Sequence, residues 1–206
     1  MNKIISKELI KNRTKTVLFT SSGESEGKTF VGVNLALNFV NNSPQRVLLV
    51  DMNLRNPQFH KIFKVPKESG VTDILNDKVH FEDTLKKTKH PNLTILTSGT
   101  YGGIVTQSFS DLQFVIEEIK SSFDLIILES SPLLVSNKNN IDPAILSSLI
   151  DTVILVVMAR KTRKLSILKA IELVELSGGE IFGTVLNNRF APQKHKKKGI
   201  IQQKGI

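Results

Sequence analysis

Short continuous runs of apolar residues alternate with amphipathic segments along most of this chain. Six runs have the length of a strand that is buried on both faces, at 16–20, 47–50, 93–96, 125–128, 153–158 and 181–186. Apolar residues at helical spacing predict helices over 28–41, 108–122 and 163–177. Because strands and helices alternate, we expect an α/β fold with a doubly wound, mainly parallel sheet and helices on both faces.

The remaining segments carry weaker patterns. Short helical pieces are predicted at 58–63, 71–75 and 81–87, and a Gly-rich loop is predicted at 97–107. The helix over 108–122 is expected to bury one face, formed by Phe109, Leu112, Val115, Ile116 and Ile119. Residues 1–15 are basic and weakly amphipathic, which fits either a short helix or a loose arm.

The segment Ser22-Gly23-Glu24-Ser25-Glu26-Gly27-Lys28-Thr29 lies between the first predicted strand and the first long helix. A strand, a loop of small residues, Lys-Thr and a helix form the pattern of a phosphate-binding P-loop, in which backbone N–H groups and the helix N-terminus face phosphate oxygens. We expect Lys28 to reach the β- and γ-phosphates and Thr29 to give its hydroxyl to Mg²⁺. Ser22 stands where the usual motif has its first glycine, so an ordinary Gly-containing turn is the alternative. The predicted nucleotide contacts of this loop are Gly23, Glu24, Ser25, Glu26, Gly27, Lys28 and Thr29.

Two carboxylates support the P-loop interpretation. Asp51 directly follows the apolar run 47–50, and Glu129 directly follows 125–128. The carboxyl ends of parallel strands lie at one edge of a sheet, where α/β proteins bind their ligands. The two acids are therefore predicted to hold Mg²⁺ directly or through water, and one of them could accept a proton from the attacking group. Helix capping by these acids is the simpler alternative.

The net charge of +9 is unevenly distributed. Residues 189–206 contain six Lys or Arg and no acid, which fits a disordered solvated tail or a segment that touches anionic membrane. No aromatic residue follows Phe190, which disfavours binding of single-stranded nucleic acid. The chain has no cysteine, no signal-peptide pattern and no apolar run long enough to span a bilayer. We therefore expect a basic arm at 1–15, one nucleotide-binding domain at 16–190 and a basic tail at 191–206.

The sequence resembles the bacterial tyrosine kinases that control capsule and exopolysaccharide export, which are P-loop proteins related to the partitioning and cell-division-site ATPases. The resemblance is carried by Leu48-Leu49-Val50-Asp51-Met52-Asn53-Leu54-Arg55-Asn56-Pro57 and by Ile126-Ile127-Leu128-Glu129-Ser130-Ser131-Pro132. It extends over about residues 16–190 and includes the stretches 70–75, 96–99 and 183–187. A P-loop NTPase fold is what the resemblance implies.

The resemblance also implies roles for individual residues and partners. Lys28 and Asp51 would be catalytic, with Asp51 as the candidate base, and Asn187 would contact adenine. The metal ligands would be Thr29, Asp51, Asn53 and Glu129, and the cofactors ATP and Mg²⁺. Arg55 matches a family arginine that could equally form a salt bridge that orients the loop. The protein would be cytoplasmic, recruited to the inner face of the cell membrane by a membrane-embedded activator of the polysaccharide co-polymerase type, and could form a homo-oligomer.

Several positions depart from the family pattern. Asn53 and Glu129 stand where the family has aspartates, and Glu24-Ser25 replaces Pro-Gly. A displacement of about 1 Å in a catalytic group can cost on the order of 100-fold in rate. Tyr101 is the only tyrosine, so the C-terminal tyrosine cluster is missing, and Glu8, Lys11 and Arg13 do not match the family's ring-forming motif.

We therefore predict an ATP- and Mg²⁺-dependent tyrosine-protein kinase of capsule or exopolysaccharide biosynthesis. A catalytically weakened, ATP-binding regulator of the same system is the first alternative, which Asn53 and Glu129 favour. The second is a partitioning or site-selection ATPase, whose additional P-loop lysine is replaced here by Gly23. Nucleic-acid binding through the tail is a fourth alternative.

Overall fold

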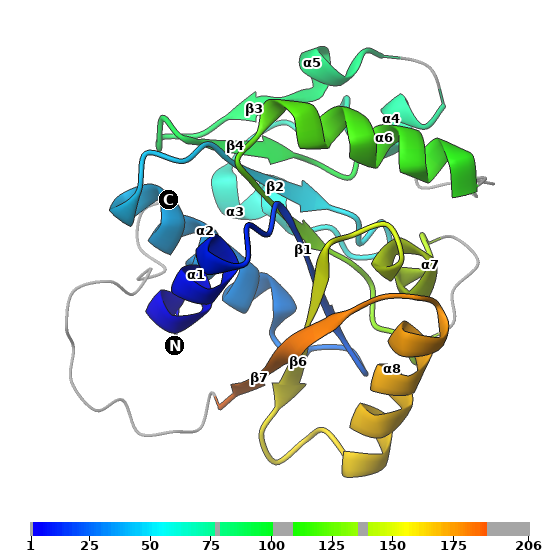
Figure 1. The fold of residues 1–206 in the computed structure, drawn as a ribbon. Coiled ribbons are helices and arrows are strands. Elements are labelled where there is room, and N and C mark those ends of the chain that lie inside the picture. Colours follow the sequence, from blue (N-terminus) through cyan, green and yellow to red (C-terminus); the bar gives the residue numbers. More distant parts are fainter. Residues whose placement is uncertain (1, 77–78, 101–108, 136–139, 189–206) are drawn as a thin grey trace.

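A seven-stranded sheet forms the centre of the molecule in the computed structural model, which describes residues 2–76, 79–100, 109–135 and 140–188 (Figure 1). The strands are β1 (Thr16–Ser21), β2 (Val47–Asp51), β3 (Lys86–Lys87), β4 (Leu93–Leu96), β5 (Leu125–Glu129), β6 (Thr152–Met158) and β7 (Ile181–Asn187). Their order across the sheet is β3-β4-β2-β5-β1-β6-β7. All pairs are parallel except β3 with β4. The six predicted strands and the doubly wound α/β fold are thus confirmed.

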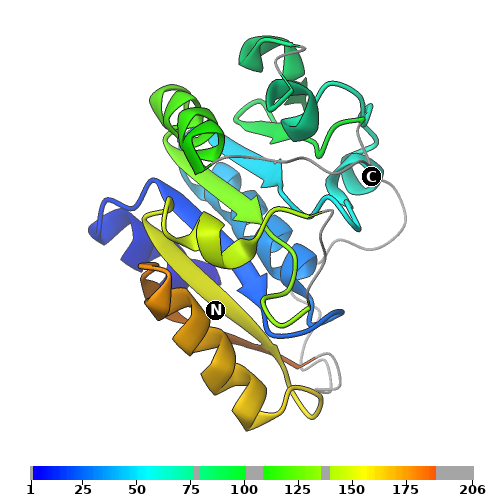
Figure 2. The same ribbon diagram turned by 90° about the vertical axis from the view of Figure 1, so that its right-hand side faces the viewer.

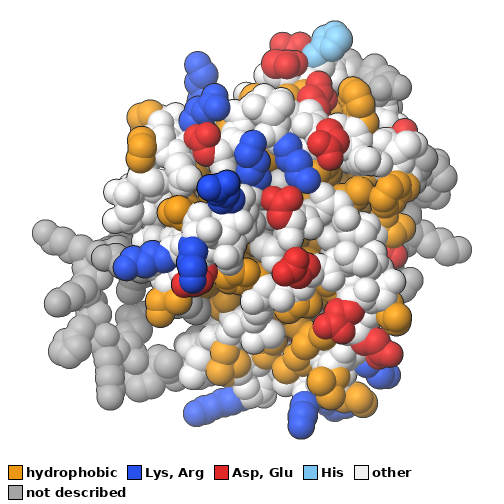
Figure 3. Space-filling view, viewed as in Figure 1, with side chains coloured by type: hydrophobic (Ala, Val, Ile, Leu, Met, Phe, Trp, Pro, Cys, Tyr) orange, Lys and Arg blue, Asp and Glu red, His pale blue; other side chains and the backbone are white. Residues whose placement is uncertain are grey.

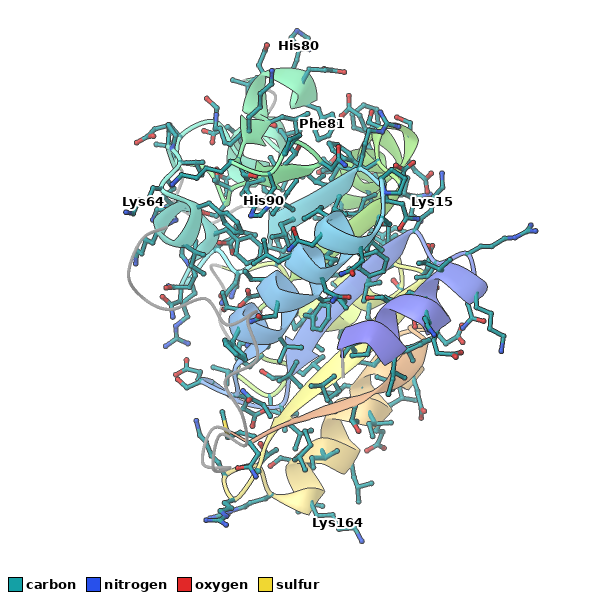
Figure 4. The ribbon with its side chains drawn as sticks, turned by 90° about the vertical axis from the view of Figure 1, so that its left-hand side faces the viewer. Lys15, Lys64, His80, Phe81, His90 and Lys164 are labelled. Atoms are coloured by element: carbon teal, nitrogen blue, oxygen red, sulfur yellow. The ribbon has the colours of Figure 1, made fainter. Side chains whose placement is uncertain are left out.

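Helices cover both faces of this sheet. Helices α1 (Asn2–Lys11), α2 (Lys28–Asn42) and α3 (Phe59–Phe63) lie on one face (Figure 4). The other face carries α4 (Val71–Ile74), α5 (Phe81–Thr84), α6 (Phe109–Ser122), α7 (Pro143–Ser147) and α8 (Lys164–Leu176). Figure 2 shows α6, α7 and α8 side by side on that face.

The pleat of the strands divides the apolar residues between two cores. In β1, Val17 and Phe19 pack with residues of α1 and α2, whereas Leu18 packs with residues of α6 and α7. All six residues of β1 and all five of β2 are buried, because central parallel strands are covered on both faces. The continuous apolar runs in the sequence are a direct result of this double burial.

Three local predictions need correction or completion. The helix predicted over 81–87 ends at Thr84, and Lys86–Lys87 instead forms the antiparallel edge strand β3. Phe109 is 52% exposed and does not share the buried face of α6, because it stands at the first position of that helix. The short helix α7 was not predicted from the pattern; the Asp142 carboxylate caps it by accepting a hydrogen bond from the Ala144 amide.

The N-terminal segment adopts the first of its two predicted forms. Residues 2–11 form α1, which packs on α2 and buries Leu9 in the same core as Phe39. In the described part of the chain, no helix is both long and apolar enough to cross a membrane.

Candidate nucleotide-binding site

The strand order brings the P-loop and both predicted acids to one edge of the sheet. β5 lies between β2 and β1, so Glu129 is in register with Asp51 on one side and with Phe19 on the other. The segment after β1 therefore begins beside the carboxyl ends of β2 and β5. A cleft of about 820 Å³ opens there and is lined by Glu24, Ser25, Glu26, Gly27, Lys28, Thr29, Phe30, Asn53, Arg55, Asn56, Gln58, Glu129, Pro132, Met158, Asn187 and Asn188. Of the predicted site residues, Gly23 and Asp51 do not line it.

The backbone of the loop requires glycine at Gly27. This residue has φ of +93°, and a Cβ built on it would clash with the Asn187 side-chain amide. Asn187 Nδ2 donates a hydrogen bond of 3.1 Å to the Glu26 carbonyl, so the end of β7 supports the loop just before α2 begins. Ser25 also has a left-handed backbone, with φ of +58°, where the family pattern has glycine. A side chain in this conformation costs roughly 1–2 kcal/mol, which the surrounding contacts must offset.

Lys28 and Thr29 begin α2 and point toward the other groups of the site. Lys28 is 6% exposed, and its Nζ donates a hydrogen bond of 2.9 Å to Ser21 Oγ. Burial lowers the pKa of Lys28, although the carboxylates of Glu129, Glu26 and Glu24 oppose this shift. Thr29 Oγ1 donates a hydrogen bond of 2.6 Å to Glu129 Oε1. The predicted phosphate-binding and metal-binding side chains thus meet across 100 positions of sequence.

Asp51 is buried and hydrogen-bonded to the chain that follows it. Its Oδ2 accepts hydrogen bonds from the amides of Gln58 at 2.8 Å and Phe59 at 3.1 Å, and its Oδ1 accepts one from Asn53 at 3.3 Å. Burial raises the pKa of Asp51 to about 6, against these three N–H groups, which lower it. Asp51 therefore holds the start of α3, as the helix-capping alternative predicts. Its roles as a metal ligand and base stay predictions.

Glu129 has a less complete set of partners than Asp51. It is 4% exposed, and its Oε2 has no hydrogen-bond partner among the described residues. Burial, and secondly the charge of Asp51, raises the pKa of Glu129 to about 8, while the Thr29 hydroxyl and Lys28 act in the opposite direction. A buried polar atom without a partner is costly in a protein interior, which makes this oxygen a candidate for contact with a bound ion or water.

Glu26 has a structural role that the sequence did not reveal. It is 3% exposed, and its carboxylate accepts hydrogen bonds from the Ser22 amide at 3.2 Å and from Ser22 Oγ at 3.1 Å. Thr162 Oγ1, in the turn after β6, donates a further hydrogen bond of 2.6 Å to Glu26 Oε1. The same Thr162 oxygen accepts a hydrogen bond of 2.9 Å from the Met158 amide. Glu26 therefore joins the two ends of the P-loop to the neighbouring strand.

The outer part of the loop is held by cations. Arg55 Nη1 lies 3.2 Å from Glu24 Oε1, which is the salt bridge that the sequence left open as one role of Arg55. Lys161 Nζ donates a hydrogen bond of 2.6 Å to the Glu24 carbonyl. Neither Lys161 nor Thr162 was predicted, because nothing in the sequence says that β6 pairs with β1. Knowledge of the strand order would have placed the turn after β6 beside the P-loop.

The remaining predicted residues are only partly tested by the geometry. Asn53 and Asn187 line the cleft, and Asn53 is 8% exposed. Among the described residues there is no group of three or more His, Cys, Asp or Glu that could hold a metal. A metal site would therefore combine a carboxylate with hydroxyl or amide oxygens. Tyr101 and the basic tail at 191–206 lie outside the described residues.

Fold and site together define a P-loop NTPase. The β1–loop–α2 unit presents a buried lysine and a threonine beside two carboxylates at the carboxyl edge of a parallel sheet. A family model described as an AAA domain matches residues 15–174. Tyrosine-protein kinase YwqD of Bacillus subtilis is 28% identical over 192 residues, which cover 92% of this chain and 78% of that protein. Tyrosine-protein kinase CpsD of Streptococcus agalactiae is 31% identical over 176 residues, which cover 84% of this chain and 75% of that protein.

Solved structures agree with these relatives. The kinase domain of VpsO is 27% identical with a TM-score of 0.79, and the match covers 91% of this chain and 92% of that one. The septum site-determining protein MinD of Pyrococcus horikoshii, solved with Mg-ADP, shares the fold at 22% identity and a TM-score of 0.71, over 86% of this chain and 71% of that one. The chain belongs to the AAA-domain family and, within it, to the bacterial tyrosine-protein kinases.

Proposed function

We propose that this chain is an ATP- and Mg²⁺-dependent tyrosine-protein kinase that acts in capsule or exopolysaccharide biosynthesis. The observation that carries the proposal is the meeting of Lys28 and Thr29 with Glu129 at the carboxyl edge of the sheet. Family membership supports the tyrosine specificity, because the curated relatives are tyrosine-protein kinases.

In this proposal the P-loop holds the phosphates of ATP. The N-terminus of α2 supplies backbone N–H groups, and Lys28 Nζ exchanges its hydrogen bond with Ser21 Oγ for phosphate oxygens. Arrival of phosphate charge favours the ammonium form of Lys28, whose pKa is lowered by burial in the protein alone. Asn187 lies on the same cleft and is the proposed adenine contact.

The residues present fit a magnesium ion. Glu129 Oε2 is buried without a hydrogen-bond partner among the described residues, and the neighbouring Thr29 hydroxyl and Asn53 amide supply oxygen atoms, the ligands that Mg²⁺ prefers. We propose Thr29, Asn53 and Glu129 as the groups that hold it, with Asp51 acting directly or through water. When bound, the ion neutralises charge that develops on the transferred phosphoryl group.

Asp51 is the proposed proton acceptor. A carboxyl group with a pKa of about 6 is largely ionised at neutral pH and can take a proton from a hydroxyl that attacks phosphorus. Its Oδ1 has only the longer backbone hydrogen bond, 3.3 Å from the Asn53 amide, so this oxygen is the more available of the two.

A catalytically weakened, ATP-binding regulator is the second candidate, and the state of Glu129 favours it. A carboxyl group with a pKa of about 8 is mainly protonated at neutral pH, and it must lose that proton before it can hold a metal. Asn53 in place of a second acid further lowers the negative charge of the site. A partitioning-type ATPase remains the third candidate, which the glycine at position 23 disfavours.

Partners and location follow from family membership as proposals. The activator would be a membrane-embedded protein of the polysaccharide co-polymerase type, which recruits the kinase to the cytoplasmic face of the membrane. We also propose that the chain self-associates. Because Glu8, Lys11 and Arg13 do not match the ring-forming motif of the family, this association would use other contacts.

Transfer of labelled γ-phosphate from ATP to a Tyr-rich peptide tests the proposal, with ATP binding measured in parallel. We expect Mg²⁺-dependent transfer that falls at least 1,000-fold in Lys28→Met, as expected when a main stabiliser of transition-state charge is removed. The matched control is Lys87→Met, which removes an exposed lysine of β3 and should leave transfer unchanged. ATP binding without transfer, with and without the membrane activator, would contradict the kinase and support the regulator. Dimerisation driven by ATP would support the partitioning type.

A further inference from the structure

Helix α8 exposes leucines on its solvent side. Leu165 is 63% exposed, Leu168 52% and Leu176 78%, whereas Ala170 and Val174 on the opposite side are fully buried. Helical spacing places Leu165, Leu168 and Leu176 along the outward face, so they form a ridge on the surface of the molecule. Scattered exposed leucines are ordinary, but three on one outward helix face are not required by the core of this protein.

Cations surround the first half of this ridge. Arg160, Lys161, Arg163, Lys164 and Lys169 are all exposed and lie within ten residues. Figure 4 shows Lys164 projecting from the end of the molecule, and Figure 3 shows basic and hydrophobic side chains together at the lower end, where α8 lies. The acidic residues Glu172 and Glu175 occupy the second half of the helix. We call residues 160–169 the basic corner.

The placement of these charges does not serve the stability of α8. The first turn contains no acid, and the last turn contains no base. The helix dipole favours acids at the N-terminus and bases at the C-terminus. In α8 the bases lie near the N-terminus and the acids near the C-terminus, so these charges oppose the dipole preference. Arg163, the N-cap residue, makes no side-chain capping hydrogen bond. The clustering of cations here therefore needs an explanation outside the helix.

We propose that the basic corner docks on the surface of an anionic lipid bilayer. Leu165 and Leu168 would enter the boundary between headgroups and acyl chains, and Arg163, Lys164 and Lys169 would contact lipid phosphates. An outward ridge of leucines beside long cationic side chains suits a fluid surface, whereas peptide partners are usually held in grooves.

The position of the end of β7 also supports an anionic bilayer as the partner of this surface. β7 ends at Asn187, whose carbonyl accepts a hydrogen bond of 2.9 Å from the Ala159 amide, directly before the basic corner. The sequence beyond it, residues 189–206, adds six Lys or Arg and no acid. The basic corner therefore lies next to the end of β7, the strand that precedes this basic sequence.

This surface is separate from the reaction chemistry, and the inference does not depend on the proposed kinase activity. It nevertheless adjoins the P-loop, because Lys161 Nζ is bonded to the Glu24 carbonyl. For that reason Lys161 is left unchanged in the test below.

Flotation of the full chain with vesicles tests the proposal. Vesicles of phosphatidylglycerol and phosphatidylcholine are compared with vesicles of phosphatidylcholine alone. We expect binding to the anionic vesicles, weakened about 10-fold or more by Arg163→Glu with Lys164→Glu. The control pair Lys87→Glu with Lys89→Glu makes the same change in net charge at exposed positions near the opposite edge of the sheet, and should weaken binding less than 3-fold.

A second pair of variants tests the leucines. Leu165→Ser with Leu168→Ser should weaken binding about 5-fold or more, while Phe114→Ser, at a 67% exposed position of α6, should not. The proposal is overturned if the wild type does not float with anionic vesicles, or if the corner variants bind like their controls, which would assign binding to the tail or to net charge. It is equally overturned if the leucine variant abolishes a dimer in solution, since a second copy would then be the occupant. Circular dichroism of each variant verifies that it is folded.

Discussion

The two halves of the candidate site differ in how fully their polar groups are satisfied. On the P-loop side, the Glu26 carboxylate, the Glu24 carbonyl and the Glu26 carbonyl each have partners from outside the loop: Thr162, Lys161 and Asn187. On the carboxylate side, Glu129 Oε2 has no partner among the described residues, and the pKa values of both acids are raised by burial. Contacts from outside the loop hold its shape, whereas the Glu129 carboxylate keeps one oxygen that no described residue contacts by a hydrogen bond.

This difference has a physical reason. A phosphate-binding loop acts through the fixed directions of its N–H groups, so its shape must be determined in advance. A metal site instead needs unshared electron pairs, and a protein that satisfied them internally would lose the ligand. In the proposed metal site, the raised pKa of Glu129 lowers the cost of its unpaired oxygen in the protein alone, because the buried group is then mainly neutral near pH 7.

The largest expected effect comes from Glu129→Gln. The pKa of Glu129 is about 8 in the folded protein, above its ordinary 4.5, so the folded state keeps a proton that the unfolded chain releases. Without metal, the contribution of this carboxyl to the free energy of unfolding is therefore fully present below about pH 4.5 and is lost as the pH rises through about 8. The variant should be more stable than the wild type at pH 8 by about 2–4 kcal/mol, with little difference at pH 4.5. Urea unfolding without Mg²⁺ at the two pH values measures this.

Metal addition sharpens the same comparison. Mg²⁺ with ATP should restore the stability of the wild type at pH 8 but have a much smaller effect on Glu129→Gln, because the ligand carboxylate is gone. The matched control is Glu117→Gln, at an exposed position of α6, which should leave the pH dependence as it is. If the free energy of unfolding depends on pH in the same way in the wild type and in Glu129→Gln, the pKa of Glu129 is not raised in the folded protein.

Thr162→Val is expected to have the intermediate effect. Valine keeps the shape but removes the hydrogen bond to the Met158 amide and the shorter of the two hydrogen bonds to Glu26 Oε1, which costs about 1–3 kcal/mol. We also expect the KM for ATP to rise about 10-fold with a smaller change in kcat, because the loop loses its fixed shape. Thr162→Ser retains the hydroxyl and should restore the KM. A loss of stability with an unchanged KM for ATP would show that Thr162 stabilises the fold but does not shape the loop for ATP binding.

Arg55→Ala should have the smallest effect. Its ion pair with Glu24 is about half exposed on both sides, and surface pairs of this kind contribute about 0.2–1 kcal/mol at most. Thermal unfolding should shift by less than 3 °C, and the KM for ATP by less than 3-fold. Glu24→Gln should behave alike, since it breaks the same pair. A loss of transfer in Arg55→Ala beyond 100-fold would instead assign Arg55 to the reaction.

The sheet was predictable from the sequence, and its short or polar additions were not. Strands such as β2 and β5 are buried on both faces, so their residues are apolar without interruption. By contrast, β3 consists of two lysines at the edge of the sheet, so no apolar pattern in the sequence predicts it. α7 is five residues long, and Phe109 sits at a helix start where its position in the periodic pattern does not fix its exposure.

Part of the candidate site could also be predicted from the sequence, because its residues lie at or after the ends of predicted strands. Glu129 directly follows the predicted strand 125–128, and the loop that leads to Lys28 and Thr29 follows the first predicted strand, so parallel strands bring these groups to one edge. The partners of Glu26 and Asp51 are harder to foresee, because Asp51 is bonded to main-chain amides that every sequence has. The role of Thr162 can be predicted only when β6 is known to pair with β1.

The hydrogen bond between Thr29 and Glu129 also bears on how the molecule folds. It joins residues 100 positions apart, and contacts of such separation form only after the loop-closure entropy between them has been overcome. The site is therefore complete only when β1 has docked between β5 and β6. A nucleotide bound as proposed would bind the native chain and not its partly folded forms, so a higher nucleotide concentration would raise the stability of the folded protein.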